Sequence, residues 1–181
     1  MRERKPKVYI FRGAPASGKG TLVPEFAKTL PKPVALIEQD KLRWGIHLIG
    51  REVTDITSEE HRMAYENTLA LYERYLKVGR YTIVVEGLFT WDNEQSDQGA
   101  AKTFLELAEA NGFEATSIVL AAEKAVLARR NVERQSYTTP PEEFDALYES
   151  IYSTIDSSEL VIDSTNETSE QTLARLMQFI S

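Results

Sequence analysis

The stretch that decides the fold is Gly13-Ala14-Pro15-Ala16-Ser17-Gly18-Lys19-Gly20-Thr21, which directly follows the apolar run Val8–Phe11. The spacing G-x-x-x-x-G-K between a strand-forming run and a helix-compatible segment is typical of a phosphate-binding loop, or P-loop. Glycines let successive N–H groups turn toward one anion, and the helix that follows adds its positive dipole end. We therefore predict that all nine residues bind the phosphates of ATP, with Lys19 supplying a mobile charge and a catalytic role.

The residue after the lysine departs from the usual motif. Most such loops have Ser or Thr there, whose hydroxyl contacts Mg²⁺, and this chain has Gly20. Gly18-Lys19-Gly20-Thr21 is similar to the loop of adenylate-kinase-like enzymes, with Thr21 available for an inner phosphate. We expect Mg²⁺ to be held mainly by phosphate oxygens, water and carboxylates, which suits a cation that keeps several waters.

The composition favours one domain over residues 1–181, because a chain of this length lies within the usual range of about 100–200 residues. Apolar residues make up 42%, enough for one core. No apolar run approaches the ~20 residues of a membrane span, and the charged N-terminus has no apolar leader. The chain has no cysteine, so we expect a cytoplasmic protein without a membrane partner.

The net charge is 21 − 28 = −7. Broad binding to long nucleic acid depends on Lys and Arg that neutralise phosphates, so this balance disfavours it. A local basic pocket for one terminal phosphate remains compatible with the charge. The oligomeric state does not follow from the sequence.

Short apolar runs alternate with longer helix-compatible segments along the chain. This order predicts an α/β fold of the P-loop NTPase class, a five-stranded parallel sheet with helices on both faces and a small helical lid at about 124–140. The predicted strands are Val8–Phe11, Val34–Ile37, Thr82–Val85, Thr116–Leu120 and Leu160–Ile162. The predicted helices are Gly18–Leu30, Asp40–Ile49, Ser58–Val78, Gln95–Asn111, Lys124–Arg134, Pro141–Thr154 and Ser169–Ile180.

Asp40 and Arg43 follow the second predicted strand, at the sheet edge where ligands of such folds bind. A carboxylate there could orient an acceptor hydroxyl and take its proton, so we assign Asp40 a catalytic role. Arg43 lies on the same helix side and would bind a phosphate or carboxylate of the acceptor. The alternative is that Asp40 only caps the helix that begins at Lys41.

Glu86 ends the apolar run Ile83–Val85 and is followed by Gly87. An acid at the carboxyl tip of such a strand is the arrangement that holds Mg²⁺ through water. We therefore assign Glu86 to metal and substrate binding, the alternative being an ordinary Glu in a turn.

Arg130 and Arg134 are four residues apart and project from one helical face. Phosphoryl transfer needs cations on the γ-phosphoryl oxygens, and arginines of a lid supply them, so we predict that both are catalytic. Arg129 points elsewhere. The alternative is a solvated face that pairs with neighbouring glutamates.

Four aromatic or imidazole side chains flank Asp40 and Glu86 in the sequence and are candidates for the acceptor pocket, although core packing is the commoner role. They are Trp44, His47, Phe89 and Trp91. His61 lies in a polar helix start and is expected to be exposed. Asp163–Asn166 would either approach the adenine or cap the last helix.

Together these residues resemble P-loop kinases related to the 5′-hydroxyl polynucleotide kinases, and more loosely the zeta-toxin-like and chloramphenicol-phosphotransferase-like kinases. Asp40-x-x-Arg43 looks like the acceptor motif of the polynucleotide kinases, where Asp is the general base and Arg binds a substrate phosphate. The stretch 130–134 is similar to their R-N-x-x-R lid, and Thr139-Pro140 with Phe144–Tyr148 resembles the segment that follows it. Glu86 replaces the Asp of many relatives.

Three functions are consistent with this pattern. The first is a kinase that moves the γ-phosphoryl of ATP to a hydroxyl of a small or nucleotide-like acceptor. The second is the same chemistry on a nucleic-acid 5′ end, and the third is a nucleotide-dependent switch or binding module without transfer.

Overall fold

The computed structural model describes residues 6–46, 57–134 and 137–180, and a parallel β-sheet runs through its middle. Its strands are β1 (Lys7–Arg12), β2 (Val34–Glu38), β3 (Thr82–Gly87), β4 (Glu114–Ala121) and β5 (Leu160–Asp163). They lie in the order β2-β3-β1-β4-β5, and every neighbouring pair is parallel. The five-stranded parallel sheet expected from the sequence is confirmed.

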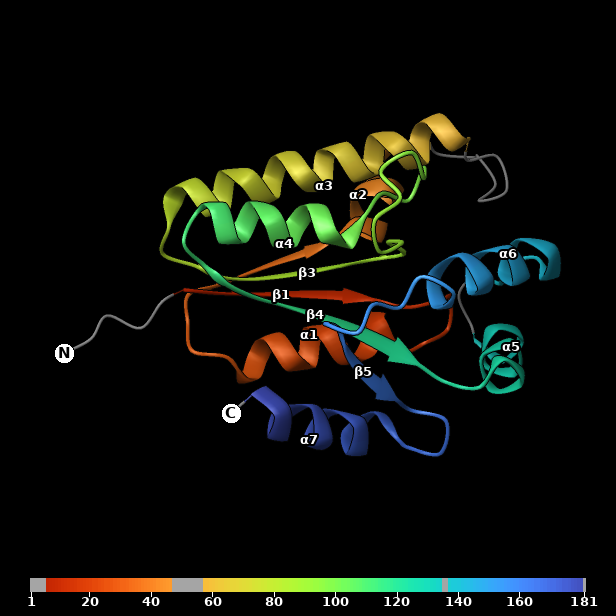
Figure 1. Cartoon of the computed structure of the whole chain (residues 1–181). Coiled ribbons are helices and arrows are strands. Elements are labelled where there is room, and N and C mark those ends of the chain that lie inside the picture. Colours follow the sequence, from red (N-terminus) through yellow and green to blue (C-terminus); the bar gives the residue numbers. More distant parts are fainter. Residues whose placement is uncertain (1–5, 47–56, 135–136, 181) are drawn as a thin grey trace.

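Helices cover both faces of the sheet (Figure 1). On one face lie α2 (Gln39–Ile46), α3 (Ser58–Val78) and α4 (Ala101–Ala110), and on the other α1 (Lys19–Thr29) and α7 (Ser169–Ile180). Two further helices, α5 (Lys124–Glu133) and α6 (Pro141–Tyr152), lie beyond the carboxyl ends of the strands. Among the described helices, none has the length and apolar character needed to cross a bilayer.

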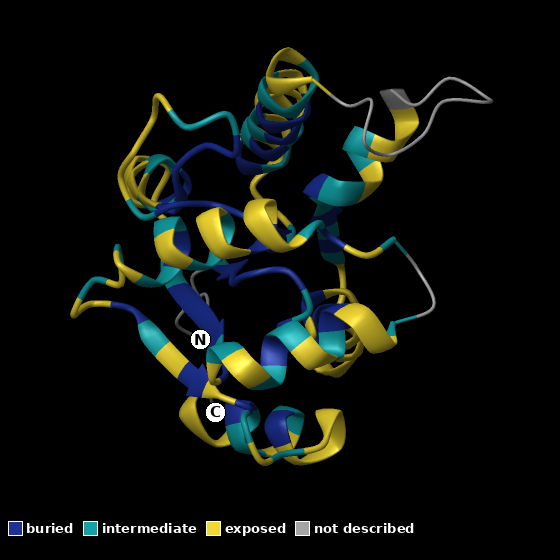
Figure 2. Cartoon of the chain, turned by 90° about the vertical axis from the view of Figure 1, so that its right-hand side faces the viewer, coloured by how far each residue is buried: buried dark blue, intermediate teal, exposed yellow. Residues whose placement is uncertain are grey.

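Each layer has its own apolar core, because alternate residues of a strand point to opposite faces. Ile10 packs with α3 and α4, whereas Phe11 packs with Phe26 of α1 and Leu176 of α7. A third cluster joins Ala14 of the P-loop to α5 and α6. Figure 2 looks onto the carboxyl end of the sheet, with the buried strands inside and exposed helix faces around them.

Local sequence accounts for the ends of α3. Thr57 and Glu60 form a capping box, in which each side chain accepts a hydrogen bond from the other residue's backbone N–H. At the other end Gly79 has φ +73°, the left-handed conformation that glycine adopts readily. The predicted bounds Ser58–Val78 are confirmed.

The prediction of a helix from Gln95 is wrong, since α4 begins at Ala101. Residues 88–100 form a loop that a bridge between Thr90 and Ala100 closes. Gly99 has φ +78°, and a Cβ on it would lie 2.1 Å from the ring of Tyr65. Because of this tight turn at Gly99, the helix cannot start before residue 100. The predicted helix Asp40–Ile49 runs beyond the described residues, which end at Ile46 before the gap.

Candidate active site

The P-loop joins the carboxyl end of β1 to α1. Gly18 precedes the helix with φ +94°, and no side chain caps the start of α1. The first turn also contains no acidic residue, so the positive helix end faces outward uncompensated. Gly13 packs directly on β4, because a Cβ there would lie 2.4 Å from the carbonyl oxygen of Leu120. The loop therefore has the form of an anion-binding site.

Lys19 lies inside this loop and is buried. Its Nζ donates hydrogen bonds to the carbonyl oxygens of Gly13, at 2.7 Å, and Ala14, at 3.2 Å. Burial lowers the pKa of Lys19, while the carboxylates of Glu86 and Asp40 oppose that shift. The side chain thus lies folded against the backbone of the loop, with its Nζ on the carbonyl oxygens of Gly13 and Ala14.

A cavity of about 620 Å³ opens in front of the loop. Of the residues predicted to be catalytic or to bind ATP, Mg²⁺ or the acceptor through a charged group, it contains all except Gly13 and Ala14 of the loop. Besides loop residues 15–21, its lining residues are Glu38, Asp40, Lys41, Arg43, Trp44, Glu86, Leu88, Arg130, Arg134, Tyr137, Thr139, Glu143 and Leu147. A hollow of about 740 Å³ at the opposite end of the sheet, near Lys7 and Arg80, contains none of the predicted residues.

Asp40 and Arg43 face each other on α2. The helix begins at Gln39, so Asp40 lies in its first turn and not at the cap position before Lys41 that the alternative gave it. Asp40 Oδ1 is 3.0 Å from Arg43 Nη2, and the Asp40 side chain is 46% exposed while that of Arg43 is 13% exposed. Arg43 Nε is buried and has no hydrogen-bond partner among the described residues. An exposed carboxylate beside a guanidinium with unused hydrogen-bonding capacity suits binding of a polar ligand.

Glu86 is the most deeply buried acid of the cavity and pairs in register with Glu38 of β2. Burial raises its pKa to about 7, although Lys19 acts in the opposite direction. The described residues contain no group of three or more His, Cys, Asp or Glu that could enclose a metal. Lys19 compensates the burial of this carboxylate only in part, so a hydrated divalent cation would fit beside Glu86.

Arg130 and Arg134 both line the cavity, but their guanidinium groups have different partners. Arg130 Nη2 donates to the carbonyl oxygen of Ser164 at 2.8 Å, and Arg134 Nη2 donates to Thr139 Oγ1 at 2.9 Å. Arg134 Nε is buried without a partner among the described residues. Arg129 is outside the cavity and approaches Glu133 at 3.9 Å, with both side chains 66% exposed. The three neighbouring arginines thus occupy different environments.

Residues 8–151 match the AAA_33 family, whose description is AAA domain. The chain belongs to the AAA_33 family. Its fold is the P-loop NTPase fold, which solved structures of kinases share at low sequence identity. A candidate kinase from Chloroflexus aurantiacus is 18% identical with a TM-score of 0.73, covering 98% of this chain and 97% of its own. No curated protein sequence matches the chain significantly.

Two further structures have names that state their activity. A gluconokinase from Sinorhizobium meliloti is 18% identical with a TM-score of 0.59, covering 98% of this chain and 97% of its own. A thymidylate kinase from Candida albicans is 14% identical with a TM-score of 0.64, covering 97% and 91%. At these identities the likeness shows the P-loop fold alone. The narrower resemblance to polynucleotide kinases stays a prediction.

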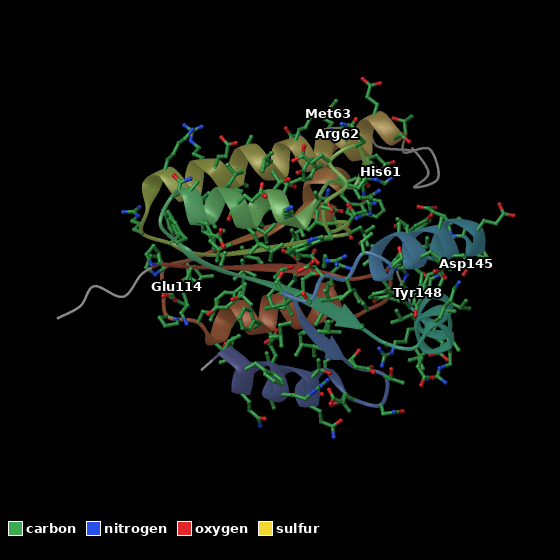
Figure 3. The ribbon with its side chains drawn as sticks, viewed as in Figure 1. His61, Arg62, Met63, Glu114, Asp145 and Tyr148 are labelled. Carbon is green, nitrogen blue, oxygen red and sulfur yellow. The ribbon has the colours of Figure 1, made fainter. Side chains whose placement is uncertain are left out.

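The expectation that His61 is exposed is wrong for this AAA_33 domain. The side chain is half-buried at the start of α3 (Figure 3), and its Nδ1 is 3.5 Å from Arg43 Nη1. Burial and the charge of Arg43 lower the pKa of His61. A neutral ring can accept a weak hydrogen bond from Arg43, so His61 supports the acceptor side of the cavity. The sequence alone does not indicate that His61 lies beside Arg43, because their contact depends on the packing of α3 on α2.

Two buried amides of the AAA_33 domain were missed by sequence reasoning. Gln39 Nε2 donates to the carbonyl of Gln98 at 3.2 Å, and its Oε1 accepts from the N–H of Leu88. Asn131 Nδ2 donates to the carbonyl of Thr139, whose N–H donates back to Asn131 Oδ1 at 3.1 Å. These amides hold the segments that follow β3 and α5. The sequence pattern R-N-x-x-R includes Asn131, but it does not indicate that the side chain of Asn131 bonds to the backbone of Thr139.

Of the aromatic candidates, only Trp44 lines the cavity. Phe89 is fully buried in the core under α3 and α4, and Trp91 packs against the same core. Core packing, which the sequence analysis named as the commoner role, is therefore confirmed for both, and neither lines the cavity. His47 lies outside the described residues. Ser164 and Thr168 line a smaller hollow of about 260 Å³ between the P-loop and the start of α7.

Proposed function

We propose that the protein is an ATP-dependent phosphotransferase that moves the γ-phosphoryl group of ATP to a hydroxyl of a small or nucleotide-like acceptor. The observation that supports it best is the cavity at the carboxyl edge of the sheet. One wall is the P-loop with Lys19, another is α2 with Asp40 and Arg43, and a third contains Arg130 and Arg134. One cavity thus contains separate side chains for binding the phosphate donor, for binding the acceptor, and for stabilising the charge of the transition state.

The P-loop and Lys19 bind the phosphates in this proposal. Backbone N–H groups at the start of α1 attract the anion, and the ammonium exchanges carbonyl partners for phosphate oxygens. Arg130 and Arg134, on a lid at about 124–140, stabilise the charge that develops on the transferring group.

Mg²⁺ would be held beside Glu86 through water, with no hydroxyl ligand at Gly20. When bound it neutralises charge on the phosphate oxygens. Ionised Glu86 orients the water molecules of that shell, and Lys19 balances its negative charge. Glycine at position 20 is not required by packing, because a Cβ there would meet nothing within 4 Å.

Asp40 orients the acceptor hydroxyl and takes its proton, which half-exposure and the nearby guanidinium permit. Arg43 binds an anionic group of the acceptor, since it lines the cavity beside Asp40 and its guanidinium suits a carboxylate or phosphate. We therefore favour acceptors that have a carboxylate or phosphate near the reacting hydroxyl.

A small acceptor suits the cavity better than a long nucleic acid. A volume of about 620 Å³ lies in the range of typical ligand pockets. Glu38 and Glu143 at its wall would repel a polyphosphate chain, and the net charge is −7. The names of the similar structures, a gluconokinase and a thymidylate kinase, are consistent with this choice.

The test is a screen for phosphate transfer from labelled ATP with Mg²⁺. Its arms are hydroxy acids, sugar phosphates, nucleoside monophosphates, neutral sugars and an oligonucleotide with a 5′-hydroxyl. We expect a phosphorylated product, detected by mass spectrometry, from an anionic small acceptor and none with Lys19→Ala. Labelling of the oligonucleotide alone would support the polynucleotide kinase function instead. ATP binding without transfer to any arm or to a metabolite extract would favour the switch.

A further inference from the structure

A buried ion pair lies directly behind the P-loop. Arg12 is the last residue of β1, one position before Gly13, and both its side chain and that of Glu159 are fully buried. Arg12 Nε donates to Glu159 Oε1 at 2.7 Å, and Nη2 pairs with Oε2. Removing two charges from water is costly, and an apolar pair of similar size is often at least as stable. The pair therefore suggests a role beyond stability.

The ion pair attaches the end of α6 to the sheet. Arg12 Nη1 donates to the carbonyl oxygen of Ile151 at 2.9 Å, and Nη2 donates to that of Thr154 at 3.0 Å. Glu159 also accepts hydrogen bonds from Ser117 Oγ of β4, at 2.7 Å, and from the N–H of Asp156. Directed bonds to a rigid guanidinium fix the last turn of α6 relative to β1 and β4.

Tyr152, the last residue of α6, contacts the P-loop itself. Its hydroxyl accepts a hydrogen bond from the N–H of Ala14, at 3.3 Å, and donates to the carbonyl oxygen of Leu120, at 2.8 Å. That carbonyl is the one on which Gly13 packs without a Cβ. Burial raises the pKa of Tyr152, so the hydroxyl keeps its proton. One hydroxyl therefore joins α6, β4 and the start of the loop.

The other end of α6 packs on α5. Phe144 lies in one apolar cluster with Leu127 of α5 and Ala14 of the loop. Asp145 Oδ1 is 3.0 Å from Lys124 Nζ, and Figure 3 shows Asp145 and Tyr148 on the side of α6 that faces α5. Thus α6 connects the P-loop to α5, which contains Arg130 and is followed directly by Arg134.

We propose that Tyr152 is a positioning residue which, supported by the Arg12–Glu159 pair, fixes α6 to the P-loop and so sets where the two arginines that line the cavity lie. The inference rests on the proposed phosphoryl transfer. Tyr152, Arg12 and Glu159 are absent from the described lining of the cavity, so they act through other groups. A misplacement of about 1 Å by a distant substitution can reduce a rate by ~10²-fold.

The test is Tyr152→Phe, which keeps the ring and its packing on Tyr148 but removes the hydroxyl. We expect kcat for transfer to the acceptor found by the screen to fall roughly 10- to 100-fold. The Kd of ATP, measured by calorimetry, should stay close to that of the unaltered protein. Tyr148→Phe removes a hydroxyl one turn earlier on α6 and should leave kcat unchanged. Equal kcat for Tyr152→Phe and the unaltered protein would overturn the proposal.

A double-mutant cycle identifies the route of the effect. If Tyr152 acts through Arg134, Tyr152→Phe should lower kcat little further in an Arg134→Ala background. Fully additive losses would contradict that route.

Hydrogen exchange tests the same attachment without activity. The amide of Ala14 should exchange faster in Tyr152→Phe than in Tyr148→Phe. Unchanged exchange would refute the inference and leave the proposed function standing. Lack of transfer by the unaltered protein would refute the function, and with it the effect on kcat, but not the attachment of α6 to the P-loop.

Discussion

Lys19 and Glu86 are both buried at the same cavity, and burial acts on their pKa values in opposite directions. It lowers the pKa of Lys19 and raises that of Glu86, because in each case the neutral form is favoured away from water. Each charge also stabilises the other. The pair is therefore sensitive to any further charge that enters the cavity, and phosphates with a cation are such charges.

Replacing Lys19 by Ala should abolish phosphoryl transfer and weaken ATP binding about 10- to 100-fold, since a charge-assisted contact to phosphate is removed. The fold should persist, because the lysine hydrogen bonds lie within the loop. Calorimetric titration with ATP and a circular dichroism spectrum check both points. Undiminished turnover would contradict the P-loop assignment.

Asp40→Asn should lower kcat by on the order of 10²-fold with little change in ATP affinity. A general base typically contributes 10²–10⁴-fold, and a loose transition state favours the lower end. Steady-state kinetics with the identified acceptor provide the measurement.

Asp40→Ala separates catalysis from helix stability. Its loss in stability should be below ~1 kcal/mol, since the pair with Arg43 is partly exposed. If both Asp40 variants keep full activity and only the alanine variant melts earlier, Asp40 has a structural role alone.

At the scale of elements, α5 and the residue that ends it place their arginines in different surroundings. Arg134, the C-cap of α5, lines the cavity, and its Nε has no partner among the described residues, whereas Arg129 lies on an exposed face of α5 beside Glu133. Variants of these two neighbouring arginines therefore provide a matched comparison.

Arg134→Ala should cut kcat and kcat/KM together while the KM for ATP stays nearly constant, because a lid contact acts mainly in the transition state. Arginines in related chemistry contribute about 10³–10⁵-fold, so even partial engagement should be visible. Arg134→Lys should rescue poorly, since an ammonium lacks the planar fork. Arg129→Ala should have no effect on rate. Equal, small effects in Arg134→Ala and Arg129→Ala would mean that α5 is only a solvated helix.

The sequence predicted the elements well where apolar periodicity and end signals agreed, as in α3 with its capping box and Gly79. It failed for the start of α4, where residues before Ala101 are helix-compatible but a turn at Gly99 packs on Tyr65. That packing joins two segments distant in the chain, and local propensity does not report it.

At the scale of the molecule, the sequence predicted which motifs meet at the sheet edge, because parallel strands place their carboxyl ends together. The sequence did not predict the buried side-chain contacts that support these motifs. Arg12 and Glu159 are 147 positions apart, and Gln39 and Gln98 are 59 apart. Such contacts depend on the folded arrangement of several elements, so no spacing in the chain indicates them.

Glu86 also makes the stability of the whole nucleotide-free molecule depend on pH. Its pKa is raised from 4.5 to about 7. A carboxyl with a raised pKa in the folded state contributes stability that is complete below the unfolded value and is lost as pH rises through the folded value. Between about pH 4.5 and 7 the unaltered protein should therefore lose stability relative to Glu86→Gln, by up to roughly 3 kcal/mol.

The measurement is urea unfolding of the nucleotide-free protein and of Glu86→Gln from pH 5 to 8. Glutamine is nearly isosteric with a protonated glutamate, so the two free energies of unfolding should be similar at pH 5. At pH 8 the variant should be more stable, because it has no charge to bury. Both proteins keep Lys19, so subtracting one curve from the other removes most of its contribution. A difference that does not change with pH would show that Glu86 is already ionised in the folded protein at pH 5, with Lys19 offsetting the cost of burial.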